Sequence, residues 1–244
     1  MSLATKAASV VVAWKLDEAS GVRADQVGAN DLADTGTVGS AAGMFSNAAD
    51  FEESSTDTLT LADNATISTG DIDFMLRCWI KIESLAATGT IIIKGDTVTT
   101  TCDYTIYVDS AGNLNFRVMN PGASAFTTVT WSAALSTATW YLVHAWHDAT
   151  GNVIGIAVNA GTAVTQAFTE GVRDSAETFA LGGEPGGGRY YDGLIDDALL
   201  MKNAFLDATE RTEDYNSGTG IAFENWAAPA NTKRRDLMLL GVGC

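Results

Sequence analysis

Residues 190–203 have the longest strand pattern in the chain, because apolar side chains occupy both alternate sets of positions, as in a strand buried on both faces. Under a period of two, Asp196 shares one side with Leu200, whereas Asp197 shares the other side with Leu199. One of the two adjacent aspartates must therefore point towards an apolar face.

A short helix is predicted after this strand, and it closes near Asn216. Asp207 can cap the first turn, and Glu210, three residues further on, can reach back to the amide of the cap residue. This pairing is the sequence signature of a capping box, so we expect the helix to begin there.

Shorter apolar runs, separated by turn residues, predict a series of further strands. They cover residues 10–16, 44–51, 58–61, 73–82, 90–94, 104–109, 114–119, 125–131, 140–147, 153–159 and 179–182. In the fourth of these, Phe74 and Ile80 lie on one side and Arg77 and Lys81 on the other, so we expect one solvated face. Residues 20–40 are expected to form a loop. Many short, evenly spaced strands with almost no helix indicate a two-sheet antiparallel sandwich.

The order of these motifs resembles that of the laminin-G-like jelly-roll domains in the concanavalin A-like lectin/glucanase superfamily. The resemblance is carried by the sequence Asp-Gly-x-Ile-Asp at residues 192–196 with its capped helix, and by residues 13–30 and 43–51. It implies an all-β, two-sheet antiparallel jelly roll with one short C-terminal helix. We expect a single domain at residues 1–220, which suits a chain of 244 residues, and an extended tail at residues 221–244.

Acidic residues outnumber basic ones: 30 Asp and Glu stand against 14 Lys and Arg, for a net charge of −16. The charge disfavours nucleic acid and anionic membranes as partners, because both present negative surfaces. A solubilising surface, a bound cation or a basic partner would each agree with it. Cys78, Cys102 and Cys244 lack metal-ligand spacing and are expected to be free thiols, with Cys78 in the core. Residues 7–14 are short for a signal peptide, so we expect synthesis in the cytoplasm and no membrane insertion.

Many members of the superfamily that the chain resembles are glycosidases, whose paired carboxylates typically alternate along one strand as Glu-x-Asp-x-Glu. No such run is present, although Asp50 and Glu52 share one side of their strand. His144 and His147 lie on opposite sides of theirs, and the glycine run at residues 182–188 lacks the features of a phosphate loop. An enzyme, whether a glycoside hydrolase or a lyase, is therefore the least favoured function.

A structural calcium ion is the expected cofactor. The loop after the first strand supplies Asp17, Asp25 and Asn30, and related domains of the resembled superfamily often hold Ca²⁺ between such a loop and the final strand. Asp196 would complete the set, because a buried carboxylate must meet a cation or N–H donors. Backbone amides alone could meet that need, so both alternatives stay open.

Sugar binding requires exposed aromatic faces beside fixed polar groups. Tyr190, Tyr191 and Trp131 lie at strand ends or in loops, as does Trp226, and the first three are the candidate ligand contacts. Packing against the core is the alternative for each ring.

The predicted tail joins three basic residues to an apolar run, and we expect it to dock on a neighbouring subunit or a particle surface; a frayed end is the alternative. Its candidate assembly residues are Lys233, Arg234, Arg235, Leu237, Leu239 and Leu240. A lectin-like domain with such a tail resembles, in layout, the appendage and decoration proteins of tailed bacteriophages. The sequence therefore predicts a non-catalytic lectin-like module that is displayed on a virion and binds glycans or a host surface. A free carbohydrate-binding lectin, in the cytoplasm or released by lysis, is the alternative.

Overall fold

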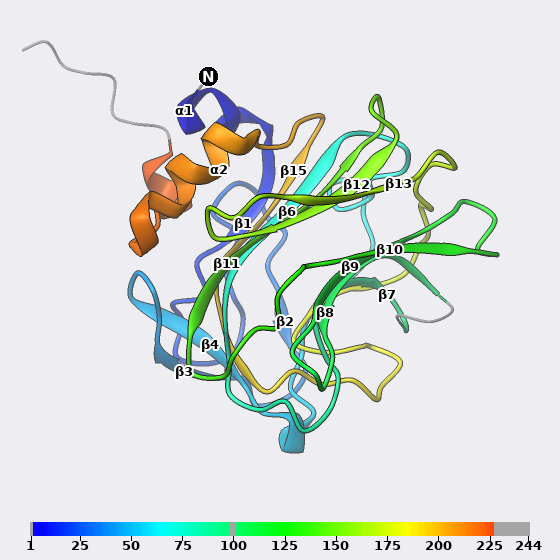
Figure 1. The fold of residues 1–244 in the computed structure, drawn as a ribbon. Helices are drawn as coiled ribbons and strands as arrows, with labels where there is room; N and C mark the ends of the chain where they lie inside the picture. The colour runs from blue at the N-terminus through cyan, green and yellow to red at the C-terminus, as the bar shows by residue number, and fades with distance from the viewer. Residues whose placement is uncertain (1, 98–100, 227–244) are drawn as a thin grey trace, which may run out of the picture.

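Two antiparallel β-sheets packed face to face form the protein, in a computed structural model that describes residues 2–97 and 101–226 (Figure 1). The first sheet has eight strands in the order β13-β12-β11-β6-β15-β4-β3, with β1 also paired to β15. Its strands are β1 (Val10–Trp14), β3 (Gly39–Ala42), β4 (Asn47–Phe51), β6 (Phe74–Ile82), β11 (Trp140–Asp148), β12 (Val153–Val158), β13 (Val164–Ala167) and β15 (Gly193–Lys202). The structure confirms the predicted sandwich.

The second sheet has seven strands in the order β10-β9-β8-β7-β14-β5-β2. They are β2 (Ala33–Asp34), β5 (Leu59–Leu61), β7 (Gly89–Gly95), β8 (Cys102–Val108), β9 (Leu114–Met119), β10 (Phe126–Thr130) and β14 (Phe179–Leu181). Every predicted strand has a counterpart, and the strands β2, β3 and β13 were not predicted. The first two of these lie wholly or partly inside the segment expected to be a loop.

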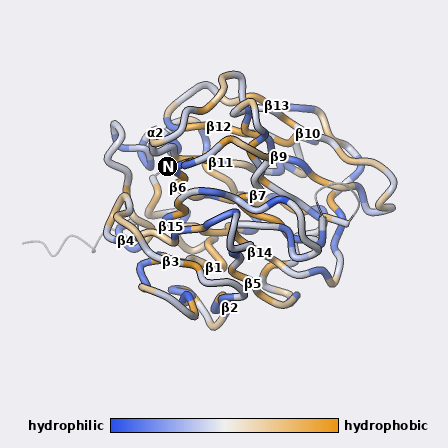
Figure 2. Tube along the Cα trace, turned by 90° about the horizontal axis from the view of Figure 1, so that it is seen from below, coloured by the Kyte–Doolittle hydropathy of each residue, from blue (hydrophilic) through white to orange (hydrophobic). Residues whose placement is uncertain are grey.

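The main hydrophobic core lies between the two sheets. Phe74 and Ile80 of β6 face it, as predicted, and Cys78 is buried there too. Trp14 of β1 stacks on Phe179 of β14 with the ring centroids 5.3 Å apart, which joins the two layers. Figure 2 shows hydrophobic and hydrophilic positions interspersed along the strands of both sheets. Removing these apolar faces from water is the main driving force for closing the sandwich.

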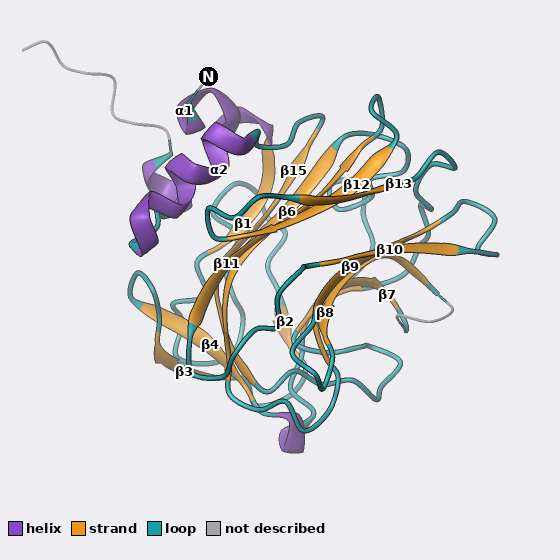
Figure 3. Cartoon of the chain, in the orientation of Figure 1, coloured by secondary structure: helices purple, strands orange, loops and turns teal. Residues whose placement is uncertain are grey.

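Helical segments cover the outer face of the first sheet (Figure 3). They are α1 (Leu3–Lys6), α2 (Ala208–Tyr215) and short 3-10 turns that include Phe223–Asn225. Met201 and Trp226 belong to a second buried cluster beneath them. Because Trp226 is only 2% exposed, the folded domain extends past the predicted boundary at residue 220. Among the described residues, no helix is long and apolar enough to cross a membrane.

The predicted helix begins with the expected capping box. The carboxylate of Asp207 accepts a hydrogen bond from the Glu210 amide, and the carboxylate of Glu210 accepts one from the Asp207 amide, each at 2.9 Å. The helix ends at Tyr215, and the left-handed Asn216 follows. This local signal therefore fixed the start of α2 correctly.

A buried ionic network lies under α2, where the alternation in β6 predicted a solvated face. Arg77 is fully buried, and its Nε and Nη2 each donate to the carboxylate of Asp214 at 3.0 Å. Asp197 accepts from Nη1 of the same guanidinium at 2.5 Å, while Nε2 of His144 and Nε1 of Trp226 lie 2.8 and 3.2 Å from Asp214 oxygens. The prediction of a solvated face at Arg77 was wrong because α2 and the segment after it pack there.

A β-bulge in β15 changes which side chains share a face. Asp196 pairs with Trp79 and Leu199 with Arg77, so β15 has one more residue than β6 over this span. Asp197 is in the left-handed region at φ 48° and absorbs the extra residue. Neither aspartate points into the main core. The prediction that Asp196 and Asp197 lie on opposite faces of the strand was wrong, because the bulge interrupts the period of two.

Candidate functional site

A groove lined by hydroxyl groups lies at the edge of the second sheet where β2, β5 and β14 meet. Its volume is about 390 Å³. Tyr190, one of the predicted ligand contacts, lines it together with Glu184 and Pro185. Five threonines complete the lining: Thr35, Thr56, Thr58, Thr60 and Thr178. We call this feature the Tyr190 groove.

The register of β5 explains why threonines line the groove. Leu59 of β5 is buried in the main core, and Thr60 beside it points away from the core. Thr60 pairs with Ala33 of β2 on one side and with Ala180 of β14 on the other. Neighbouring hydroxyls are held in place as well, since Thr35 Oγ1 donates to the carbonyl of Thr58 at 3.0 Å.

The glycine-rich loop between β14 and β15 places the ring of Tyr190. A Cβ at Gly183 would lie 2.6 Å from the methyl of Thr58 and 2.7 Å from the Tyr190 ring, so only glycine allows the two groups to approach as they do. Gly182 before it has φ 82°, in the region that favours glycine. The loop therefore has a specific role in building the groove.

Glu184 supplies a carboxylate to the same groove. Its side chain is 4% exposed, and Nη1 of Arg189 lies 3.7 Å from Oε1. The groove therefore combines an aromatic ring, several hydroxyls and a carboxylate. Such a lining suits a neutral sugar, which offers C–H groups to the ring and hydroxyls to the polar atoms.

The other two predicted ligand contacts do not join Tyr190. Tyr191 is 1% exposed and packs in the main core, so this part of the prediction was wrong: adjacent residues point to opposite sides, and only one of the pair can face the groove. Trp131 is half-buried against the core beside Gly161 and follows β10, at the opposite edge of the sheet from β2. Trp226 is buried under α2.

The predicted metal ligands separate into two groups. Asp17 and Asp196 line one small pocket of about 70 Å³, together with Asp197, Lys15 and Glu224. Lys15 already forms an ion pair with Glu224, so the pocket contains a cationic group of its own. The structure thus brings two of the four predicted ligands together, between the loop after β1 and the last strand.

Asp196 is held mainly by backbone amides. Its Oδ2 accepts from the amides of Met44 and Phe45, at 2.6 and 3.3 Å, in the turn between β3 and β4. Burial raises the pKa of this carboxyl group to about 7, although those two hydrogen bonds oppose the rise. Backbone amides therefore meet the buried carboxylate of Asp196, as one of the two alternatives predicted. Binding of Ca²⁺ at this pocket stays a prediction.

Asp25 and Asn30 lie together in a separate loop site. Oδ2 of Asp25 accepts from the amides of Gly28 and Asn30 and from Nδ2 of Asn30, and its Oδ1 accepts from the amides of Ala13 and Val27, all within 3.2 Å. N–H donors repel a cation, so this carboxylate orders the loop. Neither residue lines the pocket at Asp196.

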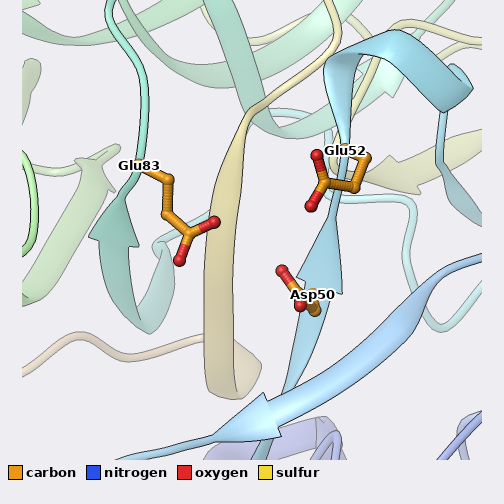
Figure 4. Close-up of side chains that lie close together, drawn as sticks. All are labelled: Asp50, Glu52 and Glu83. Carbon is orange, nitrogen blue, oxygen red and sulfur yellow. The ribbon is translucent and has the colours of Figure 1, made fainter.

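Three carboxylates meet on the outer face of the first sheet near its lower end. Asp50, Glu52 and Glu83 each place an oxygen within 4.8 Å of the others. Figure 4 shows that Asp50 and Glu52 come from one segment and Glu83 from another. Burial raises the pKa of all three, and the charge of Asp192 adds to each rise. Sequence reasoning identified the first two and missed Glu83, which comes from a distant strand end.

The family of this chain follows from its match to a known sequence model. Residues 53–209, more than half of the chain, match the model described as the concanavalin A-like lectin/glucanases superfamily. The chain belongs to this superfamily. The matched span contains Thr58, Glu184 and Tyr190 of the groove. No curated protein sequence is similar enough to add a closer relative.

Solved structures of similar fold include binding domains of toxins and one domain of an enzyme. The binding domain of Paraclostridial Mosquitocidal Protein 1 matches with a TM-score of 0.70 at 16% identity, over 86% of this chain and 52% of that one. The binding domain of botulinum neurotoxin serotype D matches with a TM-score of 0.66 at 16% identity, over 88% and 52%. This chain therefore spans about half the length of those toxin domains.

Domain 4 of AbnA, an extracellular arabinanase from Geobacillus stearothermophilus, was solved in complex with arabinotriose. It matches with a TM-score of 0.68 at 17% identity, over 84% of this chain and 97% of that one. At this identity the likeness shows the fold alone. The match spans nearly the whole of that domain.

Proposed function

We propose that this superfamily member is a non-catalytic glycan-binding module whose Tyr190 groove holds a neutral sugar. The observation that carries the proposal is the placement of the Tyr190 ring, fixed by Gly183 and Thr58, beside the carboxylate of Glu184. Structures of the same fold support it: one is the receptor binding domain of botulinum neurotoxin D, and another is the arabinanase domain in complex with arabinotriose.

Replacement of the Tyr190 ring tests the proposal. Binding to a panel of neutral oligosaccharides, with arabinotriose as the first probe, would be measured by calorimetry for the whole chain. Tyr190→Ala is expected to weaken binding at least about tenfold, the factor that corresponds to ~1.4 kcal/mol, whereas Tyr190→Phe keeps the ring and most of the affinity. Equal binding by wild-type protein and Tyr190→Ala would refute the groove as the site.

Phe126→Ala provides a matched control for this experiment. Phe126 is 48% exposed on β10, at the edge of the same sheet opposite the groove, and stacks with Arg117. Its loss removes an exposed aromatic ring without touching the groove, so the affinity is expected to stay unchanged. Weakening by both substitutions alike would point to a nonspecific loss.

Glycoside hydrolysis at the three carboxylates is the second candidate function. Carboxyl groups on a glycosidase lie ~5–9.5 Å apart, according to the stereochemical course, and a raised pKa suits the general acid. The close approach of Asp50, Glu52 and Glu83, with their raised pKa values, is the observation in its favour. Release of reducing ends that Asp50→Asn and Glu52→Gln abolish would establish hydrolysis and overturn the non-catalytic proposal.

We further propose that the module is displayed on a particle such as a virion, as the sequence predicts. The assembly residues Lys233 to Leu240 lie outside the described residues, so support comes from charge. Residues 233–235 are all basic in a chain of net charge −16, which favours contact with an acidic surface, another copy of the domain included. Deletion of residues 233–244 should abolish incorporation into the particle while sugar binding persists. Unchanged incorporation would refute an anchoring role.

A further inference from the structure

A second pocket lies between α2 and the turn that joins β12 to β13. Its volume is about 310 Å³. Ala208, Arg211 and Thr212 line it from one face of the helix, and the turn contributes Gly161 and Thr162. Most of the lining side chains are small, so the guanidinium of Arg211 is the main charged group that faces the space.

Arg211 is buried and forms no ion pair within the part of the chain that the structure describes. It is 8% exposed, and no carboxylate among the described residues lies within 4.0 Å of its nitrogens. Glu210 beside it is directed elsewhere, with one oxygen 3.6 Å from Nζ of Lys6 and hydrogen-bonded to the amide of Asp207. A buried charge is normally paired, because desolvation of an unpaired ion costs several kcal/mol. Asp207 and Glu210 act on the pKa of Arg211 only through their charge, so among the described residues the guanidinium keeps the capacity to pair with an acidic ligand.

The guanidinium is held in place by the protein, yet most of its donors are unused. Nη1 donates to the carbonyl of Leu206 at 2.7 Å, and the guanidinium carbon lies 4.6 Å from the ring centroid of Trp146. Within the described chain its side chain donates no other hydrogen bond, although a guanidinium carries five N–H groups. A fixed fork of free donors at the wall of a pocket matches the two oxygens of a carboxylate.

We propose that this pocket binds the carboxylate of an acidic sugar, such as a uronic acid residue of a polysaccharide. The fork of Arg211 would take the carboxylate. The hydroxyls of Thr162 and Thr212 would meet sugar hydroxyls, since Oγ1 of Thr212 donates to the carbonyl of Ala208 and keeps its acceptor capacity. A pocket of about 310 Å³ leaves room for the ring, which a site built only for a small inorganic anion would not need. This site is separate from the Tyr190 groove.

Titration with glucuronate, with glucose as the neutral counterpart and inorganic phosphate as the plain anion, tests the proposal. The whole chain is expected to bind glucuronate at least about tenfold more tightly than glucose or phosphate, and to lose affinity as salt rises. Arg211→Gln should remove about tenfold or more of the affinity, and Arg211→Lys should restore little of it because the fork is lost. The indole resonance of Trp146 would report the site.

A pocket-filling variant keeps the test valid if Arg211→Gln fails to fold. Ala208→Trp fills the space from the exposed side of α2 and should abolish glucuronate binding, whereas Thr209→Trp adds the same ring at an exposed position outside the pocket. The inference fails if glucose or phosphate binds as tightly as glucuronate, or if both tryptophan variants behave alike. If Tyr190→Ala abolishes glucuronate binding, the acid is bound in the groove: the second site is then refuted while the glycan-binding function stands.

Discussion

Removal of the Asp214 charge should destabilise the domain more than any change on the surface of α2. Four donors converge on this carboxylate: Nε and Nη2 of Arg77, Nε2 of His144 and Nε1 of Trp226, at distances of 2.8 to 3.2 Å. Burial raises the pKa of Asp214, but Arg77 and His144 outweigh it and hold the pKa below its ordinary value. The group is therefore ionised in the folded protein.

Asp214→Asn leaves the buried guanidinium with one short-range counter-ion, Asp197, and turns an amide NH₂ towards its donors. Breaking a buried ion pair in this way costs ~3–5 kcal/mol, since the remaining charge stays desolvated. Urea unfolding followed by tryptophan fluorescence would measure the change in free energy of unfolding. Glu213→Gln, the same acid-to-amide change at the exposed neighbour, should cost less than about 0.5 kcal/mol.

A double-mutant cycle with Arg77→Met sharpens the test. If the cost of Asp214→Asn is the desolvated charge of Arg77, Asp214→Asn should cost less in the Arg77→Met background than in the wild-type protein, because no guanidinium is then left without its partner. A cost below about 1 kcal/mol for Asp214→Asn in the wild-type protein, or an equal cost in both backgrounds, would refute this account of the network.

Three further predictions concern the small acidic pocket and the thiols. Burial raises the pKa of Asp196 to about 7, so its protonated form stabilises the fold fully below about pH 4, and this contribution is lost as the pH rises through 7. Asp196→Asn should therefore flatten the dependence of the free energy of unfolding on pH between about 4 and 7. The same dependence in the variant and the wild-type protein would contradict this prediction. If Ca²⁺ fills the pocket of Asp17 and Asp196, a chelator should lower the melting temperature by several degrees, because a ligand at 1,000 times its Kd adds ~4 kcal/mol to the free energy of unfolding. An unchanged melting temperature, together with no metal in elemental analysis, would refute the site. Burial raises the pKa of Cys78 and Cys102 to about 12, so a thiol reagent at pH 8 should label them only after unfolding.

The sequence predicted the sheets well because local periodicity reports which face of a strand is buried. The prediction of a solvated face was wrong at Arg77, because alternating apolar and polar residues do not show what covers the polar side. Met75 and Trp79 share the outward side with Arg77, and two large apolar residues there signal a covered face. The sequence could therefore predict that something packs on this face. It could not predict which segment does so, because Asp214 comes from a helix more than 130 residues away.

The site was less predictable than the fold for two physical reasons. A β-bulge such as the one at Asp197 leaves no trace in a period of two, although aspartate tolerates the left-handed region better than most residues. The Tyr190 groove draws Thr35, Thr58 and Glu184 from three separate segments, and no local pattern brings them together. Tyr190 itself could be identified because it lies at the start of the final strand pattern.

The position of β15 has a consequence for how the chain reaches its native state. This strand is the last one in the described residues, yet it pairs with β1, β4 and β6, so it fills the centre of the first sheet. While the ribosome is still adding residues 193–202, these earlier strands hold unpaired edges that are open to intermolecular association. Such nonlocal pairing gives a high contact order, which slows folding. A chain truncated before residue 193 would therefore lack the strand that joins its first sheet and would be prone to aggregate.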